Sequence, residues 1–281
     1  MNHIVSKLKL SDIEAQVFPD KSTIEVLIKA ATFAPSTSNC QPWKWLFERG
    51  VLYLFHDKSH SVSFGDFEEK ASMVSFGAAI ENLAIKTHSF NLELIPTLFP
   101  LLNEKLLISA FRFSNKSKNT SPIQIPTADD LVDTIELRLT NRNNGERIKI
   151  NNSTYEELQS IVNTVPGAKL WIAKDDTALE ELASIIGAAD RLRFLHPFGH
   201  YDFFSKEIRW NKEEVESTND GLDVATFDLT PSELTGLNIA KDPNVIKYLN
   251  EWKGGKAFEK MSRKAIASAS AIGFITMPEY N

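Results

Sequence analysis

The chain has 281 residues, of which 42% are hydrophobic and 24% charged, and its 31 basic against 37 acidic residues give a net charge of −6. This length can bury a large core, as one large or two modest domains, and the composition is that of an ordinary soluble protein. No block of Lys and Arg is dense enough to indicate nucleic acid or an anionic membrane surface as a partner, and no apolar run approaches the length of a membrane span, about 18 residues. One cysteine excludes an internal disulfide framework and fits a reducing compartment, so we predict a soluble, cytoplasmic protein.

The beginning of the chain predicts helices followed by strands. Ser11–Glu14 and Ser22–Glu25 have the spacing of capping boxes, so we expect two short helices, the second running from Ser22 to Phe33. Its apolar face is formed by Ile24, Leu27, Ile28 and Ala31. Four strands are then expected, the first two as a hairpin with Gly50 in its turn: Trp43–Phe47, Val51–His56, Leu92–Leu98 and Lys105–Phe113.

A long helix is predicted between the two strand pairs, from Phe67 to His88. Helical spacing relates Ala71, Val74, Ala78, Glu81 and Ile85. The small residues around Gly77 are expected to let another helix approach closely. The polar stretch Ser114–Pro126 follows the last of these strands, and its two prolines and lack of periodicity predict a linker.

The second half of the chain is richer in predicted helices. Helices are expected over Asp129–Leu137, Asn151–Val162 (with a capping box from Ser153 to Glu156), Thr177–Arg193, Ser205–Val215 and Asn244–Trp252. Two strands are expected, at Lys169–Ala173 and Ser270–Met277. Each half thus runs through helix, polar motif, strand and helix, which favours an ancient duplication.

A polar loop separates the helix Ser22–Phe33 from the first strand. Its sequence is Ala34-Pro35-Ser36-Thr37-Ser38-Asn39-Cys40-Gln41-Pro42-Trp43. Pro35 cannot continue the helix, and Pro42 favours an extended conformation at Gln41. The short hydroxyl and amide side chains between the prolines bond readily to backbone or to a polar ligand, so the loop is either a ligand-binding loop or a helix stop with a plain turn.

A second motif carries two arginines: Arg138-Leu139-Thr140-Asn141-Arg142. In an extended segment Arg138, Thr140 and Arg142 point to the same side. Guanidinium groups supply planar, charged donors that match the oxygens of a phosphate, and the Thr140 hydroxyl adds another donor. The alternative is a basic helix end that is merely exposed to solvent.

The two motifs resemble the A-P-S-x-x-N-x-Q-P-W loop and the R-x-[ST]-x-R element of the nitroreductase superfamily, whose members bind FMN. This resemblance implies that Arg138 and Thr140 bind the flavin phosphate and that Arg142 lies near the N1–C2=O edge of the ring. It also implies that the remaining cofactor-binding residues are Asn141, Pro35, Ser36, Ser38, Asn39 and Gln41.

The order of the two motifs is reversed relative to familiar dimeric nitroreductases, where the arginine element comes first. This arrangement is similar to the Acg-like branch, in which two nitroreductase halves in one chain form a pseudo-dimer with a single flavin. The implied fold is α+β, with a mixed or antiparallel sheet flanked by helices and two pseudo-symmetric halves, residues 1–125 and 126–281. Family members usually continue past a strand such as Ala271–Met277, so we expect a fragment or a shortened variant that another domain or chain completes.

Three weaker signals have a structural and a functional interpretation. His196 and His200 could share a metal, but three or four ligands are needed, and we favour pocket-lining or surface histidines without a metal site. Cys40 is interpreted as a buried small residue in preference to a nucleophile. The aromatic stretch Phe194–Phe204 forms either a core or a lid over the flavin.

The function predicted from the resemblance is an FMN-dependent oxidoreductase of nitroreductase type. NAD(P)H would donate a hydride to the flavin, which would reduce a small-molecule acceptor, while the protein would hold and tune the flavin. The alternatives are a flavin-binding or storage protein without turnover and an accessory domain of a larger enzyme.

Overall fold

The computed structural model describes residues 1–8, 17–61, 63–116 and 131–278. These form two compact units. The first consists of residues 1–140 and 213–222, and the second of residues 141–212 and 223–281. The capping box expected at Ser11–Glu14 and the expected boundary between residues 125 and 126 lie outside the described residues.

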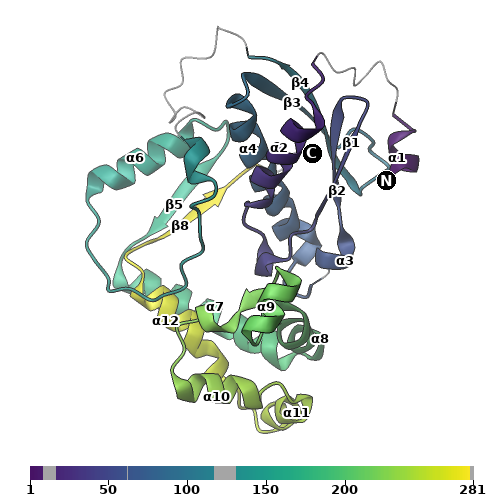
Figure 1. Cartoon of the computed structure of the whole chain (residues 1–281). Helices are drawn as coiled ribbons and strands as arrows, with labels where there is room; N and C mark the ends of the chain where they lie inside the picture. Colours follow the sequence, from purple (N-terminus) through teal and green to yellow (C-terminus); the bar gives the residue numbers. More distant parts are fainter. Residues whose placement is uncertain (9–16, 62, 117–130, 279–281) are drawn as a thin grey trace. The chain divides into compact units, whose positions relative to one another are not determined.

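The first unit is built on a four-stranded antiparallel sheet (Figure 1). Its strands, in the spatial order β1-β2-β4-β3, are β1 (Trp43–Glu48), β2 (Val51–His56), β4 (Leu107–Asn115) and β3 (Leu92–Leu98). The predicted hairpin is confirmed: Arg49 and Gly50 have φ angles of 53° and 78°, which is the left-handed pair that a tight two-residue hairpin turn requires. The predicted fourth strand is confirmed with its bounds shifted by two residues.

Every residue of β2 is buried, because the sheet has an apolar cluster on each face. Leu52 and Leu54 face the larger cluster with Phe111 and Phe113, beneath helices α2 (Lys21–Thr32) and α4 (Lys70–His88). The opposite face holds a smaller cluster: Val51, Tyr53, Phe55, Leu107 and Ala110, with Ile4 from α1 (Asn2–Val5). The α+β class, with an antiparallel sheet flanked by helices, is therefore confirmed.

Helix α2 buries the predicted face but is capped differently. Ile24, Leu27 and Ala31 are buried as expected. The N-cap is Asp20, whose carboxylate accepts a hydrogen bond of 2.7 Å from the backbone N–H of Thr23, so the capping box expected at Ser22–Glu25 is wrong. Because the carboxylate of Asp20 is the N-cap, the helix begins at Lys21, one residue before the predicted start at Ser22.

Helix α4 presents a different face to the core from the one predicted. Its large buried side chains are Phe76, Leu83 and Ile85; of these only Ile85 belongs to the predicted set, and Val74 of that set is 74% exposed. Another helix does approach the small residues of α4, because Ala79 packs with Leu27 and Ala31 of α2, whereas a Cβ at Gly77 would meet no described atom within 4 Å. Burying a phenylalanine and a leucine outweighs burying the smaller side chains on the predicted face.

The second unit is mainly helical, with a two-stranded antiparallel sheet. Strand β5 (Lys169–Ala173) pairs with β8 (Ile272–Thr276), and both strands were predicted. The longer helices are α6 (Asn152–Asn163), α7 (Asp176–Leu195), α10 (Pro231–Ile239), α11 (Pro243–Glu251) and α12 (Lys260–Ser268). Shorter elements are α3 (Lys58–Ser61) in the first unit, and α8 (Pro197–Tyr201), a π-helical turn (Asp202–Glu207), β6 (Ile208–Arg209), α9 (Lys212–Thr218) and β7 (Leu222–Asp223).

One predicted helix and one predicted capping box in this part of the chain are wrong. Ser205–Val215 is divided among the π-helical turn, β6 and α9, because Phe204 and Ile208 turn inward to a core that periodicity does not reveal. The predicted helix Asp129–Leu137 lies partly outside the described residues, and its described part includes a 3-10 turn, Val132–Thr134. Helix α6 begins after Asn151 without a side-chain cap, and a capping box is found instead at Thr230 and Glu233 of α10.

Candidate functional site

The polar loop between α2 and β1 has an unusual backbone. Ser38, Asn39 and Gln41 have φ angles of 50°, 54° and 48°, in the left-handed region. Asn tolerates this region, but each such residue costs about 1–3 kcal/mol where the surroundings hold it there. The hydroxyl of Ser36 accepts a 3.0 Å hydrogen bond from the backbone N–H of Gln41, which closes the loop on itself. Backbone held in this way is typical of ligand-binding loops.

A distant segment of the chain holds this loop from outside. The side-chain amide of Gln41 donates to the carbonyl of Asn219 at 2.8 Å, and the N–H of Gly221 donates to the carbonyl of Asn39 at 3.3 Å. Asn219 and Gly221 follow α9, in the part of the second half that belongs to the first unit. Two of the predicted cofactor-binding residues are therefore positioned by a segment to which no sequence signal had drawn attention.

Arg138 lies at the start of the same loop. Its Nε and Nη2 both donate to the carbonyl of Phe33, at 3.1 and 3.0 Å. Phe33 caps the C-terminus of α2, where a cation interacts favourably with the helix dipole. Two of the five guanidinium donors are used by described residues in this contact, so others remain available to an anion. One of the predicted phosphate-binding residues thus lies beside the residues of the Ala34–Trp43 loop.

The rest of the arginine motif belongs to the second unit. Asn141 and Arg142 line a cavity of about 340 Å³ with Asn144, Phe227, Asp228 and Lys264. The Nη1 of Arg142 reaches the Thr226 hydroxyl only at 3.5 Å, and its guanidinium lies 6.0 Å from the ring centre of Phe227. The cavity also contains Lys260 and Glu233, so three cations face two carboxylates.

One of these carboxylates is engaged by its neighbours. Asp228 accepts hydrogen bonds from Asn144 Nδ2 at 2.8 Å and from Lys264 Nζ at 2.9 Å. These two contacts lower the pKa of Asp228 to about 2, so it stays ionised at neutral pH. With both carboxylates ionised, the three cations leave the cavity one net positive charge, which suits an anionic ligand.

The arginine motif has no helix or strand, and its residues are divided between the units. Arg138 and exposed Thr140 belong to the first unit, and Asn141 and Arg142 to the second. Asn141 turns its own side chain back, its Oδ1 accepting from the N–H of Asn143 at 3.0 Å. The assignment of all four residues to one flavin remains a prediction.

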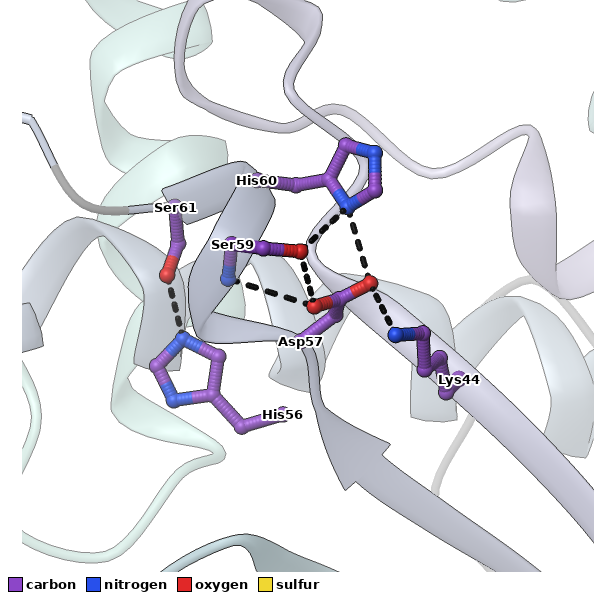
Figure 2. A network of polar contacts seen from close by, with 6 residues as sticks. All are labelled: Lys44, His56, Asp57, Ser59, His60 and Ser61. Atoms are coloured by element: carbon purple, nitrogen blue, oxygen red, sulfur yellow. Dashed lines mark hydrogen bonds and ion pairs between the residues drawn. The ribbon is translucent and has the colours of Figure 1, made fainter.

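A network of polar side chains lies where β2 ends and α3 begins (Figure 2). Asp57 accepts hydrogen bonds from Lys44 at 2.7 Å, from the Ser59 hydroxyl at 2.6 Å and from Nδ1 of His60 at 2.8 Å. Ser59 and Asp57 both contact the same nitrogen of His60, whereas a catalytic triad needs them on opposite nitrogens. This arrangement is a helix cap rather than a nucleophile and its base.

The neighbouring His56 is completely buried and neutral in character. Its Nε2 is 2.6 Å from the Ser61 hydroxyl, its ring lies edge-on to Phe76, and its Nδ1 is 3.8 Å from a carboxylate oxygen of Glu69. Burial lowers the pKa of His56 below its ordinary value of 6.5, although Glu69 acts in the other direction. Burial alone would raise the pKa of Asp57, but hydrogen bonds from Lys44, Ser59 and His60 hold it well below its usual range.

Both shifts predict that acid destabilises the first unit. His56 takes up a proton more readily when unfolded, so its contribution is complete above about pH 6.5 and is lost as the pH falls towards its lowered pKa. The contribution of Asp57 is complete above its ordinary value of 3.8 and is lost at lower pH. We expect His56→Asn to reduce the pH dependence of the free energy of unfolding below about pH 6.5. Asp57→Asn should reduce it below about pH 3.8. Urea unfolding at a series of pH values measures both effects. Curves parallel to that of the unmodified chain would contradict the assignment.

The weaker signals have structural roles. His196 caps α8 through Nδ1, which accepts from the N–H of Phe198, and the buried His200 bonds through Nε2 to the Ala240 carbonyl at 2.8 Å. Among the described residues, no group of three or more His, Cys, Asp or Glu side chains is placed to hold a metal. Cys40 is half-buried within the loop.

The aromatic stretch is core, and its interpretation as a lid is wrong. Phe194, Phe203 and Phe204 are 4–6% exposed and pack together in the second unit. Phe198 and Tyr201, which belong to α8, are 73% and 56% exposed.

Comparison with known sequences identifies relatives in Mycobacterium tuberculosis. The chain is 27% identical over 262 residues to the uncharacterized protein MT1398, a match that covers 90% of this chain and 34% of that protein. It is 26% identical over 91 residues to the protein named "Putative NAD(P)H nitroreductase acg", covering 32% of this chain and 28% of that one. The chain therefore spans about a third or less of the curated relatives it matches. The resemblance to the nitroreductase superfamily is confirmed by the similarity to Acg, whereas no family model matches the sequence.

Solved structures that match are also described as nitroreductases. A Desulfovibrio desulfuricans protein, described as a nitroreductase in complex with FMN, matches at 19% identity over 46% of this chain and 88% of its own, with a TM-score of 0.32. A nitroreductase family protein from Streptococcus pneumoniae matches at 13% identity over 42% and 90%, with a TM-score of 0.30. TM-scores this low do not support a function for this chain; the sequence motifs and the similarity to Acg do. Among the described helices, none combines the length and apolar character needed to cross a membrane.

Proposed function

We propose that the protein binds FMN and acts as an oxidoreductase of nitroreductase type, taking electrons from NAD(P)H and passing them to a small-molecule acceptor. The observation that carries this proposal is the loop Ala34–Trp43, where three residues of the motif are held in left-handed conformation. Arg138 from the second motif is bonded beside that loop. The sequence similarity to Acg supports the same class.

The donors present fit the chemistry of FMN. A phosphate needs charged N–H donors, and the guanidinium of Arg138 supplies them. The amides of Asn39 and Gln41 match the polar edge of an isoalloxazine ring. Bound FMN would supply hydride acceptance and electron transfer, which no side chain can perform. The work of the chain is to hold the phosphate and to place a cation near the reduced ring.

Titration of the flavin-free protein with FMN tests the proposal. We expect quenching of flavin fluorescence with saturation at one flavin per chain, since each motif occurs once. Anaerobic NADH or NADPH should then bleach the flavin band within seconds. Absence of binding would overturn the proposal, and a band bleached by dithionite but by neither nucleotide would reduce it to flavin storage. Binding of two flavins would contradict the single-flavin pseudo-dimer.

A further inference from the structure

The second unit contains an apolar cavity that the proposed flavin chemistry does not use. It encloses about 320 Å³ among α7, α10, α11 and the start of α12. Its walls include Phe194, Leu237, Val245, Leu249, Phe258 and Met261. A cavity of this size and apolar character, with few polar groups, is typical of small-molecule sites.

Gly236 of α10 forms part of the wall and keeps it open. A Cβ at this position would meet no described atom within 4 Å. Glycine in the interior of a helix costs up to about 1 kcal/mol relative to alanine, and no left-handed angle at Gly236 requires it. Gly236 therefore leaves space beside the cavity, although its backbone conformation does not require a glycine.

The polar groups of the cavity are concentrated on one side. Glu233 is already engaged, because its Oε2 accepts from both the N–H and the hydroxyl of Thr230, each at 2.8 Å. Lys260, the first residue of α12, is exposed and lines the cavity, and its charge also lowers the pKa of Glu233. An apolar interior beside an available cation matches a ligand with an apolar body and one negative charge.

We propose that this cavity binds a small apolar carboxylic acid, with its hydrocarbon part among the aromatic and aliphatic walls and its carboxylate at Lys260. The hydrocarbon is favoured by removal of its surface from water, and the carboxylate avoids a desolvation cost because it stays at the exposed side. The cation selects an acid over a neutral molecule of the same shape. The apolar walls do not belong to the proposed flavin site, although Lys260 also lines the cavity that contains Arg142.

Octanoate and its neutral analogue octan-1-ol test the proposal by isothermal titration calorimetry on the full chain. We expect Gly236→Phe, which places a ring at the open wall, to weaken both ligands at least tenfold. Lys260→Met keeps the apolar stem and removes the charge, so it should weaken octanoate at least threefold and leave octanol unchanged. The matched control is Gly77→Phe, at another helical glycine with no neighbour within 4 Å, which should change neither affinity.

Thermal unfolding of each variant separates lost binding from lost folding. Failure of the unmodified chain to bind either ligand would overturn the proposal. So would octanoate binding that Gly236→Phe leaves intact in a folded protein. Equal weakening of the acid and the alcohol by Lys260→Met would overturn the role of the charge.

Discussion

Phe203→Ala should destabilise the second unit by about 3–5 kcal/mol, the usual cost of removing a buried aromatic ring. Phe203 is 4% exposed and lies 4.5 Å from Phe194 and 5.1 Å from Phe204, centre to centre. The guanidinium of Arg193 lies 5.4 Å from the same ring while it binds Glu207 at 2.5 Å. Loss of the ring leaves a cavity and removes the surface on which this partly buried ion pair rests.

Hydrogen exchange of amides 194–208 measures this loss within the second unit, where a global unfolding curve would mix both units. Phe198→Ala is the matched control, because Phe198 is 73% exposed a few residues away and should cost less than about 1 kcal/mol. A lid residue would behave differently: its removal would leave stability intact and expose the flavin to nicotinamide. Unchanged exchange in Phe203→Ala would contradict the role of this ring in the core of the second unit.

The sequence predicts the elements well where local chemistry determines them. The hairpin at Arg49-Gly50 was found because only certain residues adopt its left-handed turn, and the apolar face of α2 because Ile24, Leu27 and Ala31 repeat with helical period. It fails where distant packing decides. The buried face of α4 depends on where Phe76 meets the sheet, and the π-helical turn at Asp202–Glu207 depends on the core around Phe194.

The candidate site shows the same division. The loop Ala34–Trp43 could be located from its prolines and short polar side chains, but its support by Asn219 could not, since 178 residues separate Asn219 from Gln41. Two other cations, Lys260 and Lys264, line the same cavity as Arg142. Both are more than a hundred residues from Arg142 in the sequence, and neither belongs to a motif. Local patterns identify residues with the right chemistry, whereas tertiary contacts decide which of them act together.

Arg138 has a structural contact and a predicted phosphate contact, and the two can be separated. If it binds the phosphate, Arg138→Ala should weaken FMN by about 1.5–3 kcal/mol, which is roughly a 10- to 150-fold rise in Kd. Riboflavin, which lacks the phosphate, should bind the variant and the unmodified chain alike. If the arginine only holds the Phe33 carbonyl and hence the loop, both ligands should weaken equally.

Asn39→Ala provides the comparison, because a neutral contact to the ring contributes only about 0.5–1.5 kcal/mol and should affect FMN and riboflavin to the same extent. Fluorescence titration of the two flavins against the unmodified chain and both variants gives the six affinities needed. Raising the salt concentration should reduce the difference in FMN affinity between Arg138→Ala and the unmodified chain, because screening weakens a charge–charge contact. An FMN affinity of Arg138→Ala equal to that of Asn39→Ala, with riboflavin reduced in both, would contradict the phosphate assignment and leave Arg138 as a support of the α2 C-terminus.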